Sequence, residues 1–347
     1  MNGIGKNILE AKKLNIGYKA KGKIRTISHG LDIEIHAGKM ICLLGPNGAG
    51  KSTLIKTLAG IHPQLSGTIR LGTGDLNKLT PVEIAKYLSL VLTDNIESSN
   101  LTVEELVALG RAPYTGWLGR LSPKDWEKIN WAIDETGIEK HRQKRVGELS
   151  DGERQTVLIA RTLAQDTPLI ILDEPTAHLD FPSKIAIFRL LKKLSSKGGK
   201  AILLSTHELD LAMQATDKIW LLSSRGEMII GEPEDLIIDG SFEMVFQKEG
   251  VDFDKATGNF RFQKPGLIKV SLIGEGHLAF WTRKALERNG FQISENENSV
   301  FKIEIFENKD STPSWKSHFK SVTQNHDSLK SLLQTLIEKS PSSLEGE

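Results

Sequence analysis

One glycine-rich stretch has the residue types and the spacing needed to hold a chain of phosphates. It fits the P-loop pattern G-x-x-x-x-G-K-[ST] and reads Gly45-Pro46-Asn47-Gly48-Ala49-Gly50-Lys51-Ser52-Thr53. Its glycines let the backbone curl until successive N–H groups face phosphate oxygens. Lys51 would then reach the β- and γ-phosphates, and the Ser52 hydroxyl would ligate Mg²⁺. The stretch therefore predicts binding of a nucleoside triphosphate with Mg²⁺.

The residues on either side supply the context that this motif needs. The apolar run Met40–Leu44 precedes it and predicts a buried strand, and the run from Thr53 to Ala59 predicts a helix. The start of that helix would add a partial positive charge beneath the phosphates. Cys42, the single cysteine, falls inside the strand and is expected to be a small core residue.

Two carboxylates follow a second apolar run, Leu169–Leu172. Asp173 would hold Mg²⁺ directly or through water, and Glu174 would polarise a water for in-line attack on the γ-phosphate. An isolated Asp-Glu pair after a strand would as readily lie in a solvated loop. Behind a P-loop, the pair favours hydrolysis of the triphosphate.

The stretch Leu149–Gln155 predicts the start of a helix, with Ser150 as the cap and Glu153 closing a capping box. Ser150 and Gly152 would also offer a hydroxyl and an N–H to a phosphate. The stretch resembles the L-S-G-G-Q signature of ABC-transporter ATPases, with Asp151 for the first glycine and Glu153 for the glutamine. In that family the phosphate belongs to ATP held by the opposite subunit, and both interpretations can hold at once.

Three further positions are similar to motifs of the same family. Asp180 ends a stretch that resembles the D-loop, which crosses the dimer interface, and His207 resembles the switch histidine that contacts the γ-phosphate. Tyr18 resembles the aromatic residue that stacks on adenine. Taken alone, His207 would more often be structural, and Tyr18 would more often be a core or surface residue.

One position departs from the family pattern. Thr93 stands where the family has a glutamine that ligates Mg²⁺ and couples the site to membrane subunits. A threonine hydroxyl has a shorter reach, so Asp94 is an alternative source of the oxygen.

Strands alternating with helical runs predict a parallel α/β sheet, and the runs between Leu9 and Ile35 predict an antiparallel β-subdomain. The resemblance covers residues 9 to about 236. It implies a P-loop NTPase cassette of the ABC type, with a mixed sheet core, the β-subdomain and a helical subdomain. We expect the cassette over residues 1–240, a linker over 241–266, a small C-terminal α/β domain over 267–340 and a disordered tail over 341–347.

The helical subdomain resembles one import branch of the family. The patterns L-G-R-x-P, from Leu109, and G-R-x-S, from Gly119, recur in ATPases that serve ferric siderophores, heme and vitamin B12. Exposed aromatic side chains at Tyr114 and Trp117 would suit a groove for a permease helix, although an ordinary surface loop is the alternative. The resemblance implies a homodimer, a transmembrane permease and a substrate-binding protein as partners. ATP binding would close the dimer, and hydrolysis would reopen it.

Two other functions stay open. A soluble ABC ATPase acting on translation or DNA usually has two cassettes or a long coiled-coil insertion, and neither is evident here. An exporter ATPase is disfavoured only by the pattern of the helical subdomain.

The C-terminal part begins with an apolar run from Leu267, followed by G-x-G-x-x-A from Gly274 to Ala279. This pattern predicts a strand, a turn and a helix, and is a weak match to a dinucleotide-binding fingerprint. The second strand ends without a suitable acid, because Gln292 is neutral and Glu295 is the nearest carboxylate. The alternative is a small accessory domain that dimerises or regulates.

Composition narrows the class of protein. The 347 residues are 39% hydrophobic and 26% charged, as in globular proteins, and the net charge of +1 argues against bulk binding to nucleic acid. No apolar run approaches the roughly 20 residues of a membrane span, and the N-terminus has no signal-peptide pattern. With one cysteine and therefore no disulfide framework, we expect a cytosolic protein, docked on the inner face of the cell membrane by its permease.

Overall fold

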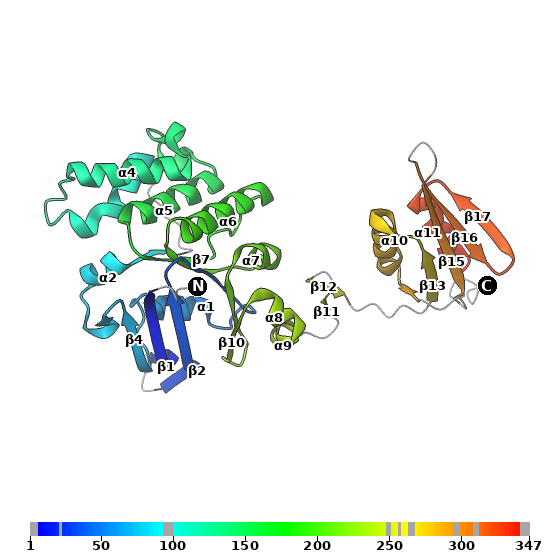
Figure 1. Cartoon of the computed structure of the whole chain (residues 1–347), viewed down its shortest axis with the longest axis horizontal. Coiled ribbons are helices and arrows are strands. Elements are labelled where there is room, and N and C mark those ends of the chain that lie inside the picture. The colour runs from blue at the N-terminus through cyan, green and yellow to red at the C-terminus, as the bar shows by residue number, and fades with distance from the viewer. Residues whose placement is uncertain are drawn as a thin grey trace. The chain divides into compact units, whose positions relative to one another are not determined.

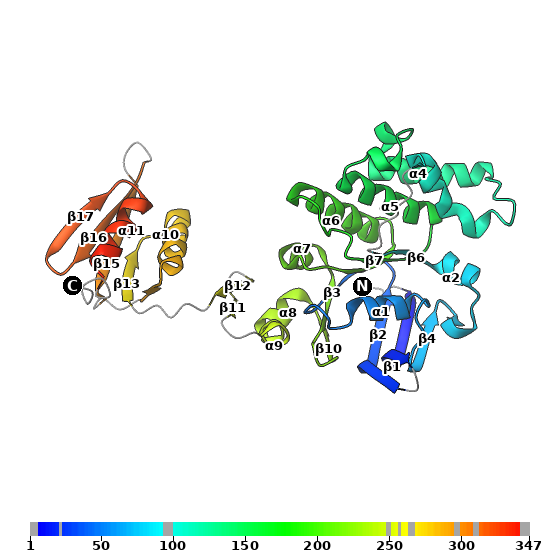
Figure 2. The same cartoon turned by 180° about the vertical axis from the view of Figure 1, so that it is seen from behind.

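The computed structural model describes residues 6–20, 23–92, 100–247, 251–255, 258–262, 268–294, 299–307 and 312–340. The chain divides into two compact units, one of Met1–Gln247 with Phe253–Asn259, the other of Lys248–Asp252 with Phe260–Glu347. Figures 1 and 2 show both units from opposite sides. Within the described residues, the helices are too short or too polar to cross a bilayer.

A six-stranded sheet forms the centre of the first unit. Its order is β10-β9-β3-β8-β7-β6, and all neighbours are parallel except β10 and β9. Every residue of β3, β7 and β8 is buried, as expected for parallel strands covered on both faces. The strands are β3 (Met40–Leu44), β6 (Leu88–Val91), β7 (Leu169–Asp173), β8 (Ala201–Ser205), β9 (Lys218–Leu222) and β10 (Met228–Gly231).

An antiparallel sheet of order β2-β1-β4-β5 forms the second layer. Its strands are β1 (Asn7–Ala20), β2 (Lys23–His36), β4 (Ser66–Leu71) and β5 (Gly74–Asp75). Helix α1 (Lys51–Leu58) lies between the two sheets (Figures 1 and 2), where Leu54, Ile55 and Leu58 belong to the same hydrophobic core as strand residues of both. The predicted β-subdomain is confirmed.

Helices cover the other face of the six-stranded sheet. Helices α4, α5 and α6 lie on that side (Figure 1), and α5 packs against α3 and α4 to form the predicted helical subdomain. The longer helices are α2 (Pro81–Tyr87), α3 (Val103–Ala108), α4 (Pro123–Thr136), α5 (Asp151–Gln165), α6 (Phe181–Ser196), α7 (Leu209–Ala215), α8 (Pro233–Ile238) and α9 (Ser241–Phe246). The 3-10 turns are η1 (Leu76–Lys78), η2 (Leu109–Tyr114), η3 (Glu139–His141) and η4 (Val146–Glu148).

The segment 241–266, expected as a linker, contains regular structure. Helix α9 packs on α8 and β9, and it buries Phe242 and Val245. The Phe253 ring stacks on Phe242, with ring centroids 5.7 Å apart. The first unit therefore extends past residue 240 to Gln247 and also includes Phe253–Asn259. Strands β11 (Val251–Asp254) and β12 (Asn259–Phe262) then form a two-stranded sheet.

The second unit is a five-stranded sheet with two helices, in the order β14-β13-β15-β16-β17. Strand β13 is parallel to β14 and β15, whereas the hairpin β16–β17, which the sequence patterns did not predict, is antiparallel. Residues of both helices meet the sheet in a separate core. The elements are β13 (Ile268–Ile273), α10 (Gly276–Arg288), β14 (Phe291–Ile293), β15 (Phe301–Glu307), β16 (Pro313–Phe319), β17 (Val322–His326) and α11 (Leu329–Glu338).

Candidate active site

The predicted P-loop connects β3 to α1 as expected. A Cβ atom at Gly45 would lie 2.2 Å from the Leu222 carbonyl oxygen, so only glycine fits beside the passing β9. Gly50 is the N-cap residue before α1, with a φ of 106°, and it provides no side-chain hydrogen bond to the helix. The first N–H groups of α1 therefore lack a side-chain acceptor at this cap, which suits them to bind an anion.

Lys51 is buried at the base of this loop. Its Nζ donates to the Gly45 carbonyl at 2.9 Å and to the Pro46 carbonyl at 3.4 Å. Burial lowers the pKa of Lys51, while the charges of Glu174 and Asp173 act in the opposite direction. The structure thus places the P-loop lysine within electrostatic reach of both predicted carboxylates.

The two carboxylates lie at the carboxyl end of β7, beside the end of β8. Asp173 pairs with Ser205 across these strands, and the Ser205 hydroxyl donates to Asp173 Oδ1 at 2.6 Å. The same hydroxyl accepts the Glu174 N–H at 2.9 Å. Glu174 itself has a left-handed backbone, with a φ of 50°. One buried serine therefore fixes both acidic residues.

His207 follows β8 and meets Glu174. Its Nε2 lies 2.9 Å from Glu174 Oε1, and both side chains are partly exposed. The structure therefore brings together Asp173, Glu174 and His207 at one end of the parallel sheet. This is the end at which open α/β sheets bind ligands.

Tyr18 lies next to the P-loop helix, on β1. Its hydroxyl is 2.9 Å from Thr53 Oγ1, and its ring packs on the His62 imidazole with centroids 4.8 Å apart. The Tyr18 side chain remains half-exposed. An aromatic face is thus available beside the predicted phosphate site.

The structure confirms the capping box at the start of α5. The Ser150 hydroxyl accepts the Glu153 N–H at 3.3 Å, and Glu153 Oε2 accepts the Ser150 N–H at 2.9 Å. These contacts lower the pKa of Glu153, the Ser150 N–H having the largest effect. Asp151 pairs with Arg154 at 3.0 Å. Asp151 and Glu153, the two acidic residues that differ from the family signature, therefore each have an interaction partner within the first turns of α5.

Gly152 joins this motif to the segment that contains Asp180. A Cβ at Gly152 would be 3.1 Å from Ser183 Oγ, so the helix starts of α5 and α6 lie together. Asp180 caps α6 by accepting the Ser183 N–H at 3.1 Å. The structure therefore gives Asp180 a helix-capping role and places the starts of α5 and α6 next to each other.

In the helical subdomain, the arginine of the L-G-R-x-P pattern is structural. Arg111 is buried, donates to Asp125 Oδ1 and to the Ala164 carbonyl at 2.8 Å each, and lies 4.0 Å from the Tyr114 ring centroid. The Tyr114 side chain is consequently partly buried, whereas the Trp117 side chain is 98% exposed. Of the two aromatic residues predicted to face a permease, Trp117 is the one fully available.

Thr93 and Asp94 lie outside the described residues. Two residues that the sequence patterns missed, Ser205 and His62, do contact the site. Ser205 had a weak signal, as the one hydroxyl ending an apolar strand. His62 had none, because it lies in the loop after α1 and meets Tyr18 only through the fold.

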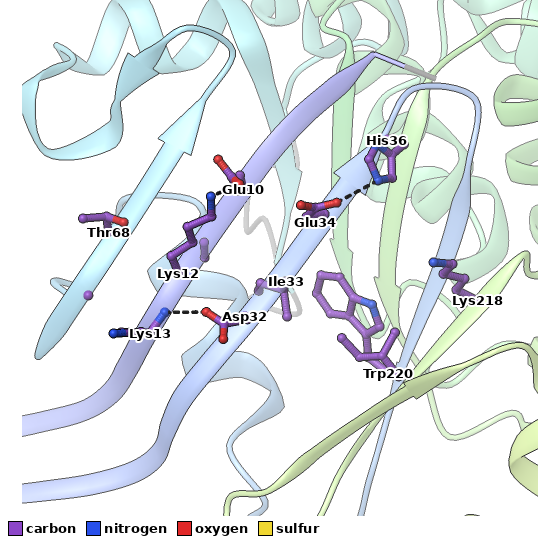
Figure 3. A pocket seen from close by; sticks show the side chains of 13 residues that line it. Glu10, Lys12, Lys13, Asp32, Ile33, Glu34, His36, Thr68, Lys218 and Trp220 are labelled. Atoms are coloured by element: carbon purple, nitrogen blue, oxygen red, sulfur yellow. Dashed lines mark hydrogen bonds and ion pairs between the residues drawn. The ribbon is translucent and has the colours of Figure 1, made fainter. Parts of the chain in front are cut away.

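An open cavity of about 800 Å³ lies elsewhere on the first unit, between the antiparallel sheet and β9–β10 (Figure 3). Its charged side chains are largely paired with one another, for example Lys12 with Glu10 at 2.7 Å and His36 with Glu34 at 3.2 Å. Among the described residues that line it are none of the predicted nucleotide ligands. The cavity is therefore separate from the candidate active site.

The fold and this site define a P-loop ATPase cassette. Residues 28–177 match the family model described as ABC transporter, and residues 268–337 match that of the iron ABC transporter C-terminal domain. The chain belongs to the ATP-binding proteins of ABC transporters, and its ATP hydrolysis is coupled to transport. The second match supplies a family for the C-terminal unit, whose resemblance to a dinucleotide-binding fingerprint stays a prediction.

Two relatives are named for iron-chelate transport, and two solved structures share the fold. The chain is 35% identical to the iron(3+)-hydroxamate import ATP-binding protein FhuC of Bacillus subtilis, covering 77% of this chain and 96% of the relative. It is 35% identical to the achromobactin transport ATP-binding protein CbrD of Dickeya dadantii, covering 69% and 87%. A putative metal-chelate type ABC transporter in an inward-facing conformation aligns at TM-score 0.61 and 24% identity, covering 74% and 96%. A dimeric bacterial ABC transporter cassette aligns at TM-score 0.57 and 25% identity, covering 65% and 99%.

Proposed function

We propose that this chain is the ATP-hydrolysing subunit of an importer for a ferric siderophore. The names of the relatives, which refer to hydroxamate and achromobactin transport, support an iron chelate over heme or cobalamin. The match of the second unit to an iron-transporter domain supports the same choice. The chain would act as a homodimer beneath a permease fed by a substrate-binding protein, at the cytoplasmic face of the membrane.

One observation supports the proposed chemistry most directly. Glu174, His207 and Asp173 meet at the ends of β7 and β8, with Ser205 between the acids. We assign Glu174 as the base that polarises the attacking water, and His207 as the group that orients Glu174 and contacts the γ-phosphate. Lys51 and the N–H groups of the loop bind the phosphates, and Tyr18 stacks on adenine. Ser150 and Gly152 bind the ATP of the partner subunit, and Asp180 lies at the dimer interface.

Mg²⁺ fits the donors present at this site. The Ser52 hydroxyl is exposed at the start of α1, and Asp173 is a buried carboxylate at the end of β7, a strand that α1 contacts. Hydroxyl and carboxylate oxygens are the donors that Mg²⁺ prefers, with phosphate oxygens and water as its remaining ligands. When bound, the ion would neutralise charge on the β- and γ-phosphates. Thr93 remains a candidate ligand on sequence grounds alone.

The test compares wild type with Glu174→Gln. We expect the variant to lose turnover by at least a hundredfold and to run as a dimer in ATP during gel filtration, because it binds ATP without cleaving it. Unchanged turnover would remove Glu174 from its assigned role. Reconstituted with its permease, the wild type should drive uptake of a ferric hydroxamate, and uptake of cobalamin alone would contradict the proposed substrate class.

A further inference from the structure

The loop after α1 brings one histidine against the predicted adenine-stacking residue. His62 is half-buried, and its Nε2 lies 2.7 Å from the Gly17 carbonyl oxygen, directly before Tyr18 in the chain. Its ring also packs on the Tyr18 ring at 4.8 Å, tilted by 56°. At the far end of Tyr18, the hydroxyl meets Thr53 Oγ1 at 2.9 Å. Tyr18 is therefore held at its backbone, its ring and its hydroxyl.

The backbone at this point needs such support. The pairing of β1 with β2 shifts register between Ile16 and Gly17. A Cβ at Gly17 would lie 2.1 Å from the Arg25 carbonyl oxygen, so the backbones of β1 and β2 approach each other closely here. Register shifts disturb the regular ladder of hydrogen bonds, and a carbonyl beside one benefits from another donor. His62 supplies that donor, which requires a proton on Nε2 because a carbonyl oxygen only accepts.

We propose that His62 is a positioning residue that presets Tyr18 for stacking on the adenine of ATP. A ring that is already fixed loses less conformational entropy when the base binds, so affinity for the base rises. His62 contacts Gly17 and Tyr18, so the effect is confined to the base and leaves phosphate chemistry alone. This inference rests on the proposed function, and specifically on the role given to Tyr18.

The test uses the full chain and two ligands, ATP and inorganic tripolyphosphate, which has the phosphates without the base. We expect His62→Leu to weaken ATP binding by about three- to tenfold, as for loss of one aromatic contact with its hydrogen bond. The affinity for tripolyphosphate should stay within twofold of wild type. For hydrolysis, KM should rise while kcat changes little.

Two further variants separate the hydrogen bond of His62 from its ring packing, and a second histidine provides a control. His62→Gln can still donate to the Gly17 carbonyl, and His62→Phe keeps only the ring, so each should restore part of the ATP affinity. His29 is exposed on β2, and His29→Leu should change neither ligand. Thermal midpoints of all variants establish that they fold.

Two results would overturn the inference. Equal losses of ATP and tripolyphosphate affinity would show that His62 only supports the P-loop. Unchanged ATP affinity in His62→Leu would show that Tyr18 needs no such support. A wild type that binds tripolyphosphate but not ATP would instead contradict the proposed function, so the two failures are distinguishable.

Discussion

Lys51 is a charged residue whose burial is useful only when phosphate is bound. Its Nζ is satisfied by two carbonyl groups, yet burial lowers its pKa, which means that the folded protein disfavours the charged form. Below the lowered pKa the lysine is charged in both the folded and the unfolded state, so this unfavourable contribution to stability is fully present there. It is relieved only as pH rises toward the unfolded value of about 10.4. The nucleotide-free protein is therefore less stable than its core would allow.

We expect Lys51→Met to abolish ATP binding and to leave the nucleotide-free protein as stable as wild type, or more stable by up to about 1 kcal/mol. Methionine has a similar length and carries no charge to desolvate. Urea unfolding at pH 7 without nucleotide measures the stability, and equilibrium dialysis measures the binding. A clear loss of stability would show that the two carbonyl contacts outweigh desolvation.

At the scale of elements, local sequence predicted the strands and helices that are apolar throughout or begin at a cap. Strand β3 matches its predicted range and β7 covers the predicted apolar run Leu169–Leu172, because unbroken apolar runs between polar turns allow little else. Helix α5 begins at Asp151, directly after its predicted cap, Ser150. The P-loop and both acids were predictable for the same reason, since each motif is contiguous in the chain.

The elements that were missed depend on distant contacts. Helix α9 is stabilised because Phe242 stacks with Phe253. Polar residues separate these two phenylalanines in the sequence. In β16, Trp315 and Phe319 face the core only once β15 and β17 flank it. Ser205 and His62 belong to the site through strand register and loop packing. Such placements arise from the tertiary fold and leave little trace in a single stretch of sequence.

Two capping boxes of nearly equal geometry separate a structural role from a functional one. Thr80 and Glu83 at α2 have contacts of 2.8 and 3.3 Å, against 2.9 and 3.3 Å for Ser150 and Glu153. We expect Thr80→Ala and Ser150→Ala each to cost about 1 kcal/mol of stability. In a Glu174→Gln background, only Ser150→Ala should also prevent the ATP-dependent dimer.

Chemical unfolding measures the loss of stability in both variants, and gel filtration in ATP measures the loss of the dimer. Retention of the dimer in Ser150→Ala would limit that serine to capping. The pKa of Glu153 is lowered in the fold, so the contribution of its box is present above the ordinary glutamate range and is lost as pH falls through the lowered value. The comparison should therefore be made near neutral pH.

At the scale of the whole molecule, each unit has its own hydrophobic core. One core joins the two sheets of the cassette around α1, and the other joins α10 and α11 to the C-terminal sheet. The described residues predicted to bind ATP all belong to the first unit. Ligand binding stabilises the cooperative unit that contains the site.

We therefore expect calorimetry of full-length Glu174→Gln to show two transitions, of which Mg-ATP raises only one. Lys51→Met in the same background provides the control, since neither transition should then move. A single transition that shifts as a whole would show that the two units unfold together.

The left-handed backbone at Glu174 affects which mutations the fold tolerates at this position. A positive φ is unfavourable for most residues and free for glycine, so Glu174→Gly is a replacement that the fold tolerates unusually well. Glutamate and glycine codons differ by one base. A single point mutation can thus silence the transporter while the polypeptide accumulates normally. Under the function proposed above, a strain carrying it would be recognised by its iron starvation and missed by any measurement of protein abundance.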